Sequence, residues 1–151
     1  MYKPPPLGPL KVTLIVVGSL IVVFGGIQAI PYGHGHINPP VFQEPTWDDP
    51  STHDLSVRAC YHCHSNTTEW PWYSEIAPYS WFYQHDIEKA RSLLDFTEFD
   101  RPQPHAHEAA TKLQNDPKHG AENISAEERA KLIAGLAKTF SSAPVIMEKQ
   151  R

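Results

Sequence analysis

Residues 60–64 read Cys-Tyr-His-Cys-His, and this short stretch contains both cysteines of the 151-residue chain. Two thiols three positions apart can each form a thioether to a vinyl group of the same haem, and the next residue then presents its imidazole to the iron. The stretch therefore predicts one covalently bound haem c. Cys60 and Cys63 would attach it, and His64 would be the proximal iron ligand.

Two other kinds of site use cysteines in a similar way. A dithiol redox centre has the same spacing, but it normally follows a strand that leads into a helix, and no strand-helix-strand alternation surrounds residues 45–70. A structural zinc site needs four Cys or His ligands, and the chain has no second cysteine pair. Haem is the interpretation that uses all three side chains.

Composition indicates an all-α protein with long irregular segments. The chain has 15 prolines and 8 glycines, which disfavour a large β-sheet. Its length suits one N-terminal transmembrane helix followed by a small, cytochrome c-like helical haem domain with extended proline-rich segments. The net charge of -4 makes nucleic acid an improbable partner.

Residues 12–30 form an uncharged apolar stretch that is long enough to cross a bilayer as one helix. A cleaved secretory signal would have a shorter apolar stretch and a small-residue cleavage site, which Gln28 to Pro31 do not provide. Lys3 and Lys11 precede the stretch, whereas all 17 acidic residues follow Ile30. The positive-inside rule then places residues 1–11 in the cytoplasm and the haem domain on the periplasmic face of a bacterial cytoplasmic membrane.

The rest of the chain divides into three predicted parts. Residues 31–50 are rich in proline and glycine and predict an extended periplasmic tether, in which His34 and His36 are interpreted as solvated loop residues. Residues 51–140 are predicted to form the haem domain, and residues 141–151 a C-terminal tail. Tyr32 and Trp47 are aromatic residues of the kind that rest at the lipid headgroup level.

Two helices and an aromatic cluster are expected in the haem domain. Apolar residues at helical spacing predict a helix over residues 78–94, and a capping box of Ser125 with Glu128 predicts another over residues 126–140. The aromatic side chains that follow the cysteines suit a haem pocket wall, although ordinary core packing would use them equally well. They are Trp70, Trp72, Tyr73 and Trp81.

A longer pattern extends the cysteine motif. Residues 63–74 read CHSNTTEWPWYS, and with residues 37–49 and 127–136 they resemble the bacterial haem-binding domain family of membrane-anchored, single-haem cytochromes c. The resemblance covers residues 22–140. It implies that Cys60, Cys63 and His64 bind the haem, as their counterparts do in the family.

The sixth iron ligand is where the chain departs from its relatives. Family members place a methionine, which looks like the distal ligand, shortly before a His-Pro-Glu-Ala-like segment; here that segment begins at His119, and the corresponding positions before it are Ala110 and Thr111 instead of a methionine. We hypothesise bis-histidine ligation with His107, or failing that His105, as the distal ligand. His119, His85, Met147 and an open site are the remaining alternatives. Imidazole in place of thioether sulfur would make the haem more reducing than that of its relatives.

The expected function is electron transfer, not catalysis. No nucleophile-base pair or phosphate loop stands out, and a haem with both axial positions filled leaves no place for a substrate. The partners would be redox donor and acceptor proteins within a larger respiratory or photosynthetic membrane complex, with Gly18, Gly25 and Gly26 available for contact with another subunit's helix. Two alternatives are a subunit whose haem braces such a complex, and a haem-based gas sensor or peroxidase with an open distal position.

Overall fold

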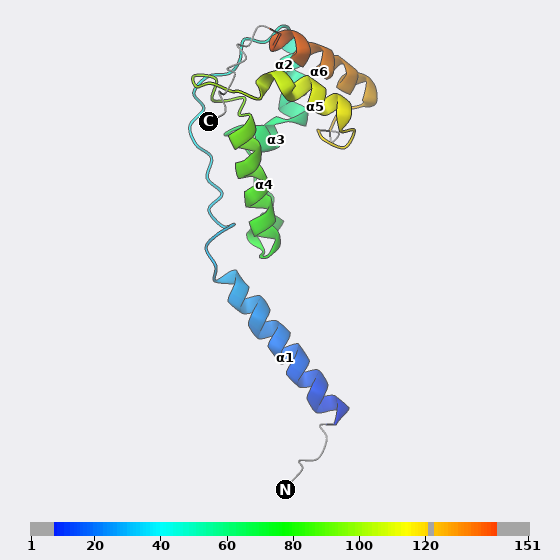
Figure 1. Ribbon diagram of the computed structural model, residues 1–151. Coiled ribbons are helices and arrows are strands. Elements are labelled where there is room, and N and C mark those ends of the chain that lie inside the picture. The colour runs from blue at the N-terminus through cyan, green and yellow to red at the C-terminus, as the bar shows by residue number, and fades with distance from the viewer. Residues whose placement is uncertain (1–7, 121–122, 142–151) are drawn as a thin grey trace, which may run out of the picture. The chain divides into compact units, whose positions relative to one another are not determined.

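The computed structural model describes residues 8–120 and 123–141, and the chain is all-α as predicted (Figure 1). Its helices are α1 (Pro9–Gln28), α2 (Pro50–Ala59), α3 (Tyr61–His64), η1 (Trp72–Glu75), α4 (Tyr79–Leu93), η2 (Ala106–Glu108), α5 (Ala109–Asn115) and α6 (Ala126–Thr139). Within the described residues, strand-like pairing is limited to a parallel bridge between Gln43 and Glu98. The chain forms two compact units: an α1 unit of residues 8–36 and 71–84, and a main unit that holds the other described residues.

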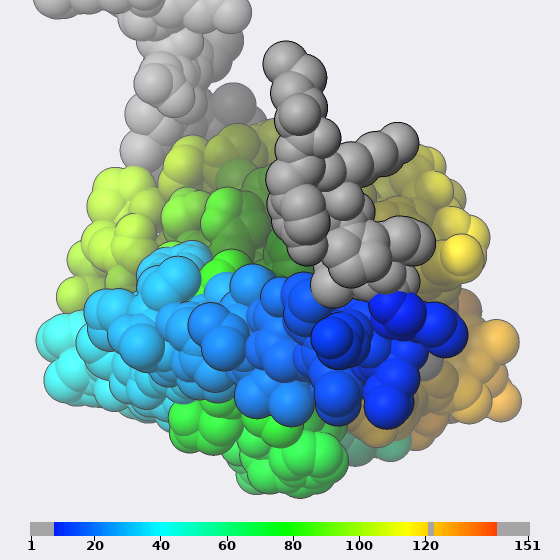
Figure 2. Space-filling view, turned by 90° about the horizontal axis from the view of Figure 1, so that it is seen from below, coloured from blue at the N-terminus to red at the C-terminus, as the bar shows by residue number. Residues whose placement is uncertain are grey.

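Helix α1 is the expected apolar helix, shifted by two to three residues toward the N-terminus. It begins at Pro9, whose fixed φ suits the first turn, and it ends at Gln28, three residues before Pro31. None of its 20 residues is buried, and Figure 2 shows part of its exposed surface in blue. At 1.5 Å per residue such a helix is about 30 Å long, so its length and composition allow it to span a membrane.

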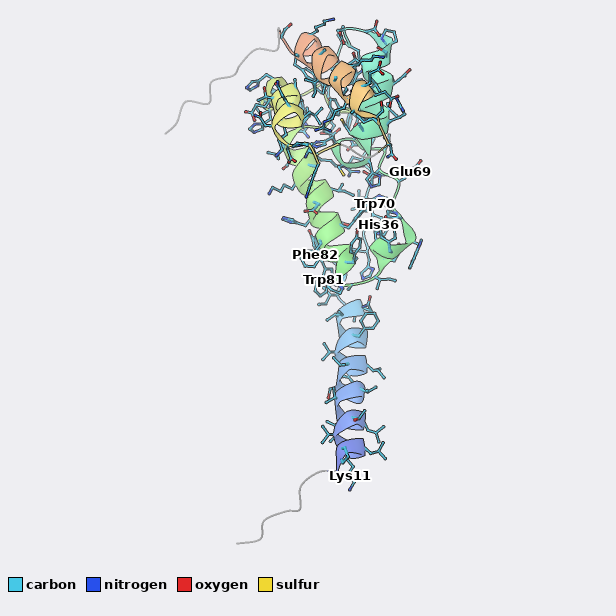
Figure 3. All side chains as sticks on the ribbon, turned by 90° about the vertical axis from the view of Figure 1, so that its right-hand side faces the viewer. Lys11, His36, Glu69, Trp70, Trp81 and Phe82 are labelled. Carbon is cyan, nitrogen blue, oxygen red and sulfur yellow. The ribbon has the colours of Figure 1, made fainter. Side chains whose placement is uncertain are left out.

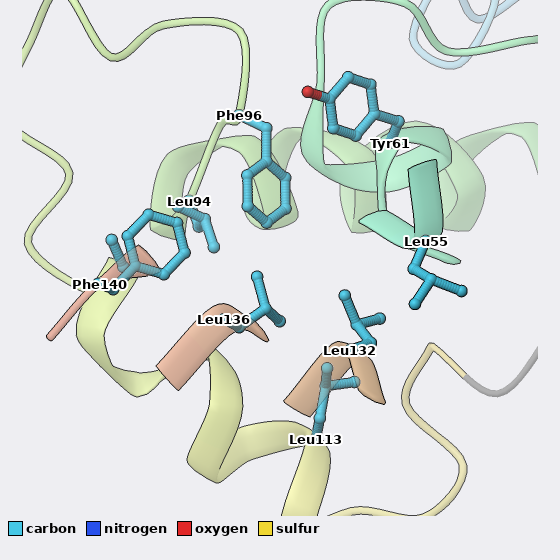
Figure 4. Close-up of a cluster of buried hydrophobic side chains, with 9 residues drawn as sticks. Leu55, Tyr61, Leu94, Phe96, Leu113, Leu132, Leu136 and Phe140 are labelled. Atoms are coloured by element: carbon cyan, nitrogen blue, oxygen red, sulfur yellow. The ribbon is translucent and has the colours of Figure 1, made fainter. Parts of the chain in front are cut away.

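The main unit is built around one hydrophobic cluster to which α6 contributes Leu132 and Leu136, and its C-cap residue contributes the ring of Phe140 (Figure 4). Phe96 lies at its centre, fully buried, and its ring stacks on Tyr61 at 5.6 Å and on Trp47 at 5.5 Å between centroids. Trp47 is therefore part of the packing of the main unit and does not act as an isolated headgroup anchor. The aromatic stack packs the segment before α2 against the loop after α4.

The structure differs from the expected tether over residues 31–50. This segment is irregular, as its prolines require, but most of it is bound to the main unit and is not a free spacer. The backbone nitrogens of Phe42 and Gln43 donate to the carbonyl oxygen of Thr97 at 2.9 and 3.1 Å, and the nitrogen of Phe99 donates back to Gln43. Proline removes donors from a chain without preventing the remaining amides from pairing with a neighbouring loop.

Helices α4 and α6 confirm the helices that were expected over residues 78–94 and 126–140. The capping box is also present: Ser125 Oγ accepts from the nitrogen of Glu128 at 3.2 Å, and Glu128 Oε2 accepts from the nitrogen of Ser125 at 2.8 Å. Helices α2 and α5 were not anticipated. The start of α2 carries a local signal, because Asp49 caps it and Pro50 occupies its first position.

The capping box provides the first testable prediction. Hydrogen bonds from Ser125, reinforced by Arg58, lower the pKa of Glu128 from its ordinary value of 4.5 to about 2. A carboxyl group with a depressed pKa stabilises the fold above its unfolded pKa and loses that contribution as the pH falls through its folded pKa. The stability advantage of the native chain over Glu128→Gln should therefore be full above pH 4.5 and shrink toward pH 2. Thermal unfolding followed by circular dichroism across this range measures it, and a difference that does not change with pH would contradict the assignment.

Candidate haem site

The cysteine motif is placed by the end of α2 and the single turn of α3. The nitrogen of Cys60 still donates to Ser56 in α2 at 2.8 Å, while the nitrogens of Cys63 and His64 donate to the carbonyl oxygen of Cys60 at 3.1 and 2.9 Å. Cys60, Cys63 and His64 thus share one tight turn. This arrangement suits two attachment points and an axial ligand for a single planar group.

His64 is held in the orientation that an iron ligand requires. Its Nδ1 donates to the carbonyl oxygen of Leu94 at 2.8 Å, and since a carbonyl only accepts, Nδ1 carries the proton and Nε2 keeps its lone pair. Burial lowers the pKa of His64, which favours the neutral form that binds metals. The nitrogen of Phe96 donates to the carbonyl oxygen of His64 at 2.8 Å, so the loop after α4 fixes both ends of this residue.

The residues that follow His64 in the motif form a hydrogen-bonded support. Ser65 Oγ donates to the carbonyl oxygen of Tyr61 at 2.6 Å, and Thr68 Oγ1 donates to that of His62 at 2.8 Å. Asn66 Nδ2 contacts both Pro40 and Glu98 at 2.9 Å. Each bond closes the turn or ties it to a distant segment, which explains why small polar residues occupy these positions.

Arg91 ties this support to the segment before α2. Its guanidinium donates to the carbonyl oxygens of Ser65 and Ile37, both at 2.8 Å, and to Asn38 Oδ1 at 2.7 Å. Trp70 Nε1 donates to the same Asn38 oxygen at 3.2 Å. A planar group with five donors can join several carbonyl oxygens at once, so one arginine fixes the position of the turn that carries His64.

An apolar cavity of about 260 Å³ opens beside His64. Its walls come from the cysteine turn, the end of α4, the η2–α5 segment and α6. The lining residues are Cys60, His64, Leu93, Leu94, Phe96, His105, Glu108, Ala109, Lys112, Leu113, His119 and Leu136. A mostly apolar pocket with a few polar groups is typical of a cofactor site.

The thiol of Cys60 is ill suited to dithiol redox chemistry. Burial is the main cause that raises the pKa of Cys60 to about 12, and the nearby Cys63 is the second cause. A reactive cysteine must be a thiolate at neutral pH, whereas this one would stay protonated. A thioether carries neither proton nor charge, so the same burial is compatible with an attached haem.

The structure separates the candidates for the sixth ligand. His105 and His119 line the cavity, while His107 and His85 do not. His107 Nε2 instead lies 3.8 Å from Glu108 Oε1, and His105 Nδ1 lies 3.4 Å from the same oxygen. Met147 lies outside the described residues. His119, one of the remaining alternatives from the sequence, is thus a cavity residue.

The expected aromatic wall is not part of the cavity lining. Trp72, Tyr73 and Trp81 belong to the α1 unit, and Trp70 is bound by Asn38, so aliphatic residues and Phe96 form the wall instead. His34 and His36 also differ from expectation, because both lie against a carboxylate: His36 Nδ1 is 2.9 Å and His34 Nδ1 is 3.5 Å from an oxygen of Glu75. Periodicity and composition do not reveal which of two compact units a side chain joins.

A turn with two cysteines and a histidine at the edge of an apolar cavity, inside an all-α fold, is an arrangement that suits haem. The chain belongs to the haem-binding domain family, whose family model matches residues 22–138. No curated protein and no solved structure matches it. The residues at the cavity fit a haem group. His64 offers an unprotonated Nε2, Cys60 lies at the cavity, and the cavity wall is mostly apolar.

Proposed function

We propose that the chain is a membrane-anchored c-type cytochrome that transfers electrons. Cys60 and Cys63 would hold one haem through thioethers, and His64 would be its proximal ligand. The observation that carries this proposal is the bond from His64 Nδ1 to Leu94, which leaves Nε2 unprotonated beside the cavity that Cys60 lines. The haem would supply one-electron chemistry, while the protein sets its ligands and excludes water from most of its surface.

The roles of the chain's own residues follow from the site. The carbonyl oxygen of Leu94 accepts the hydrogen bond from Nδ1 of His64, which fixes the tautomer of the ring. In metal-bound histidines such an acceptor also raises the basicity of the ligating nitrogen. Leu93, Leu113 and Leu136 keep the cavity apolar, which influences the redox potential. Lys112 carries a positive charge at the cavity lining and could pair with a propionate group of the haem. Its Nζ also lies 3.3 Å from Asp116 Oδ2.

We place the main unit on the periplasmic face of a bacterial cytoplasmic membrane, as a subunit of a respiratory or photosynthetic complex. The support for this orientation is charge: Lys3 and Lys11 precede the apolar helix, and the residues beyond Ile30 include 11 basic and 17 acidic side chains. A tethered redox protein meets its membrane partners at a raised effective concentration. Protease digestion of intact spheroplasts should remove the main unit, and protection of the main unit would contradict the orientation.

Carbon monoxide tests the electron-transfer proposal against sensor and peroxidase functions. A haem with two protein ligands has no open position, so the spectrum of the reduced full-length protein should not change on mixing with carbon monoxide. The same sample should exchange electrons rapidly with a small soluble oxidant in stopped-flow measurements. Complete carbon monoxide binding within milliseconds would favour a sensor or an enzyme and contradict the proposal.

A further inference from the structure

Two of the residues that line the cavity carry imidazole rings that lie close to each other. The ring centroids of His64 and His119 are 5.9 Å apart, with 54° between the ring planes. A metal bound by two imidazole nitrogens on opposite sides, with bonds of about 2 Å, separates the ring centroids by about 6 Å. Because each ring plane must only contain its own metal-nitrogen bond, the angle between the planes is free. The spacing is therefore that of two axial ligands of one iron.

The segment that carries His119 is fixed by a cation on α6. The guanidinium of Arg129 donates to the carbonyl oxygens of Leu113 and His119 at 2.6 Å and to that of Asp116 at 2.8 Å. The nitrogen of His119 also donates to the carbonyl oxygen of Asp116 at 3.1 Å. Four hydrogen bonds thus hold the turn after α5, and they place the histidine at the cavity before any ligand is bound.

The ring of His119 is also free to bind. Within residues 8–120 and 123–141, neither of its ring nitrogens makes a hydrogen bond, whereas His105 lies near the carboxylate of Glu108. A histidine that is held by its backbone, with both ring nitrogens free, costs little to convert into a ligand.

We propose that His119 is the distal ligand of the haem iron, so that the protein binds haem through His64 and His119. This proposal rests on the proposed haem c function and names the ligand that the function leaves open. It replaces His107 and His105 in that role. The methionine of the relatives is then replaced by a histidine from the following turn.

Variants of His119 test the proposal on the purified full-length protein. The low-temperature spin resonance spectrum of the ferric native protein should show the anisotropy of two imidazoles. His119→Met should replace it with that of imidazole and thioether, introduce an iron-methionine charge-transfer band and raise the redox potential. His119→Ala should bind carbon monoxide when reduced, and added imidazole should restore the native spectrum. His107→Ala and His85→Ala replace histidines that do not line the cavity, so they are the matched controls and should leave the spectrum unchanged.

The outcomes separate this proposal from the function on which it rests. A native protein without covalent haem would overturn the proposed function. A native bis-histidine spectrum that survives in His119→Ala and His119→Met, but is lost in His105→Ala or His107→Ala, would overturn the assignment of His119 alone. If His119→Ala loses its haem entirely, the spectrum of His119→Met still shows whether residue 119 is the distal ligand.

An exposed aromatic surface in the α1 unit carries a second, independent inference. It consists of Trp72, Tyr73, Ile76, Tyr79 and Phe82, here called the aromatic collar. Trp72 is 76% exposed and Phe82 is 66% exposed. Residues 71–84 include a single charged side chain, Glu75. The ring of Tyr73 lies against those of Trp72 and Tyr79, with centroids 5.7 and 5.4 Å apart. Adjoining exposed apolar side chains of this kind mark a contact with a membrane or another molecule.

The collar is attached to the carboxyl end of α1. Gln28 Nε2 donates to the carbonyl oxygen of Ala77 at 2.9 Å, and the nitrogen of Ala77 donates to Gln28 Oε1 at 2.9 Å. Gly33, with a φ of 90°, packs so closely that an added Cβ would lie 2.7 Å from the carbonyl carbon of Ser80. Figure 3 shows Trp81 and Phe82 near this end of α1, opposite the end with Lys11. If α1 spans a bilayer, the collar lies where the hydrocarbon ends.

We propose that the aromatic collar enters the headgroup region of the same bilayer that α1 spans. This proposal depends on the membrane part of the proposed function. Tryptophan and tyrosine are favoured at this depth because their rings are apolar and their N–H or O–H groups reach water. Because the collar is hydrogen-bonded to the end of the helix that spans the bilayer, lipid is favoured over a separate protein as its partner.

Photo-crosslinking in phosphatidylcholine vesicles tests the second proposal on the full chain. A benzophenone amino acid in place of Phe82 or Trp72 should form lipid adducts that mass spectrometry detects. Phe42, which is 60% exposed in the main unit, is the matched control and should give none. The same substitution at Leu20 reports whether α1 is inserted. Adducts at Leu20 without adducts at Phe82 and Trp72 would overturn the collar alone, and absence at Leu20 would overturn the membrane anchor. In native membranes, adducts of Phe82 with another polypeptide instead of lipid would also overturn the collar.

Discussion

Replacing both Cys60 and Cys63 by serine is expected to abolish covalent haem attachment completely. A serine hydroxyl does not form the thioether that joins a cysteine to a haem vinyl group, so the double variant retains only coordination through histidine. The mass of the denatured chain should fall to that of the polypeptide alone, and acidified acetone should extract all of the pigment. Each single variant keeps one thioether and should retain haem through denaturation.

The control for this prediction is Ala59→Ser, which places a hydroxyl beside the motif and leaves both thiols intact. It should keep the full mass of the haem-bearing chain. A double cysteine variant that still carries haem after extraction would show that the cysteines do not attach it. A colourless native protein would contradict the haem assignment as a whole.

Gly135→Ala is expected to be the most destabilising small substitution in the main unit. Helices α2 and α6 cross so closely that an added Cβ would lie 2.1 Å from Thr52 Oγ1 and 2.7 Å from its Cγ2. Overpacking of a buried contact costs about 1–3 kcal/mol. The better helix propensity of alanine offsets at most about 1 kcal/mol. At this degree of overlap we expect a net loss of about 2 kcal/mol in the free energy of unfolding.

A double-mutant cycle with Thr52→Ala identifies the cause. Removing Oγ1 and Cγ2 should recover part of the lost stability, because the Cβ of residue 52, 2.9 Å away, still restricts the helices. Ala137→Gly, at an exposed position of α6, calibrates helix propensity and should cost about 1 kcal/mol. Urea unfolding in a fixed detergent measures the stability of all five chains: the native chain, the two single variants, their double variant and Ala137→Gly. Equal stability of Gly135→Ala and the native chain would mean that α2 and α6 do not cross here.

Features written in adjacent residues were predicted well. The apolar helix, the capping box at Ser125 and the apolar spacing of α4 are short-range patterns, and the structure places helices where they were expected. Short patterns succeed because helix formation depends on neighbours three or four residues apart. The family match supports haem binding on the same basis, since it rests on the order of residues along the chain.

Features that join distant segments were missed or misplaced. The aromatic residues after the motif were assigned to the haem cavity, yet Trp72, Tyr73 and Trp81 belong to the α1 unit. The segment before α2 was expected to be free, yet Arg91 and Asn66 bind it. Partners far apart in sequence leave no periodic signal.

The sequence by itself determined that this protein has an apolar N-terminal helix and helical structure beyond it, and its residues 60–64 predict a haem turn. These properties depend on local spacing and on the chemistry of single side chains. Only the tertiary structure decided that Leu94 orients His64, that Gly135 lets two helices meet, and that Arg129 holds His119 at the cavity. Each of these contacts joins residues at least 10 positions apart, and such contacts depend on how the whole chain packs.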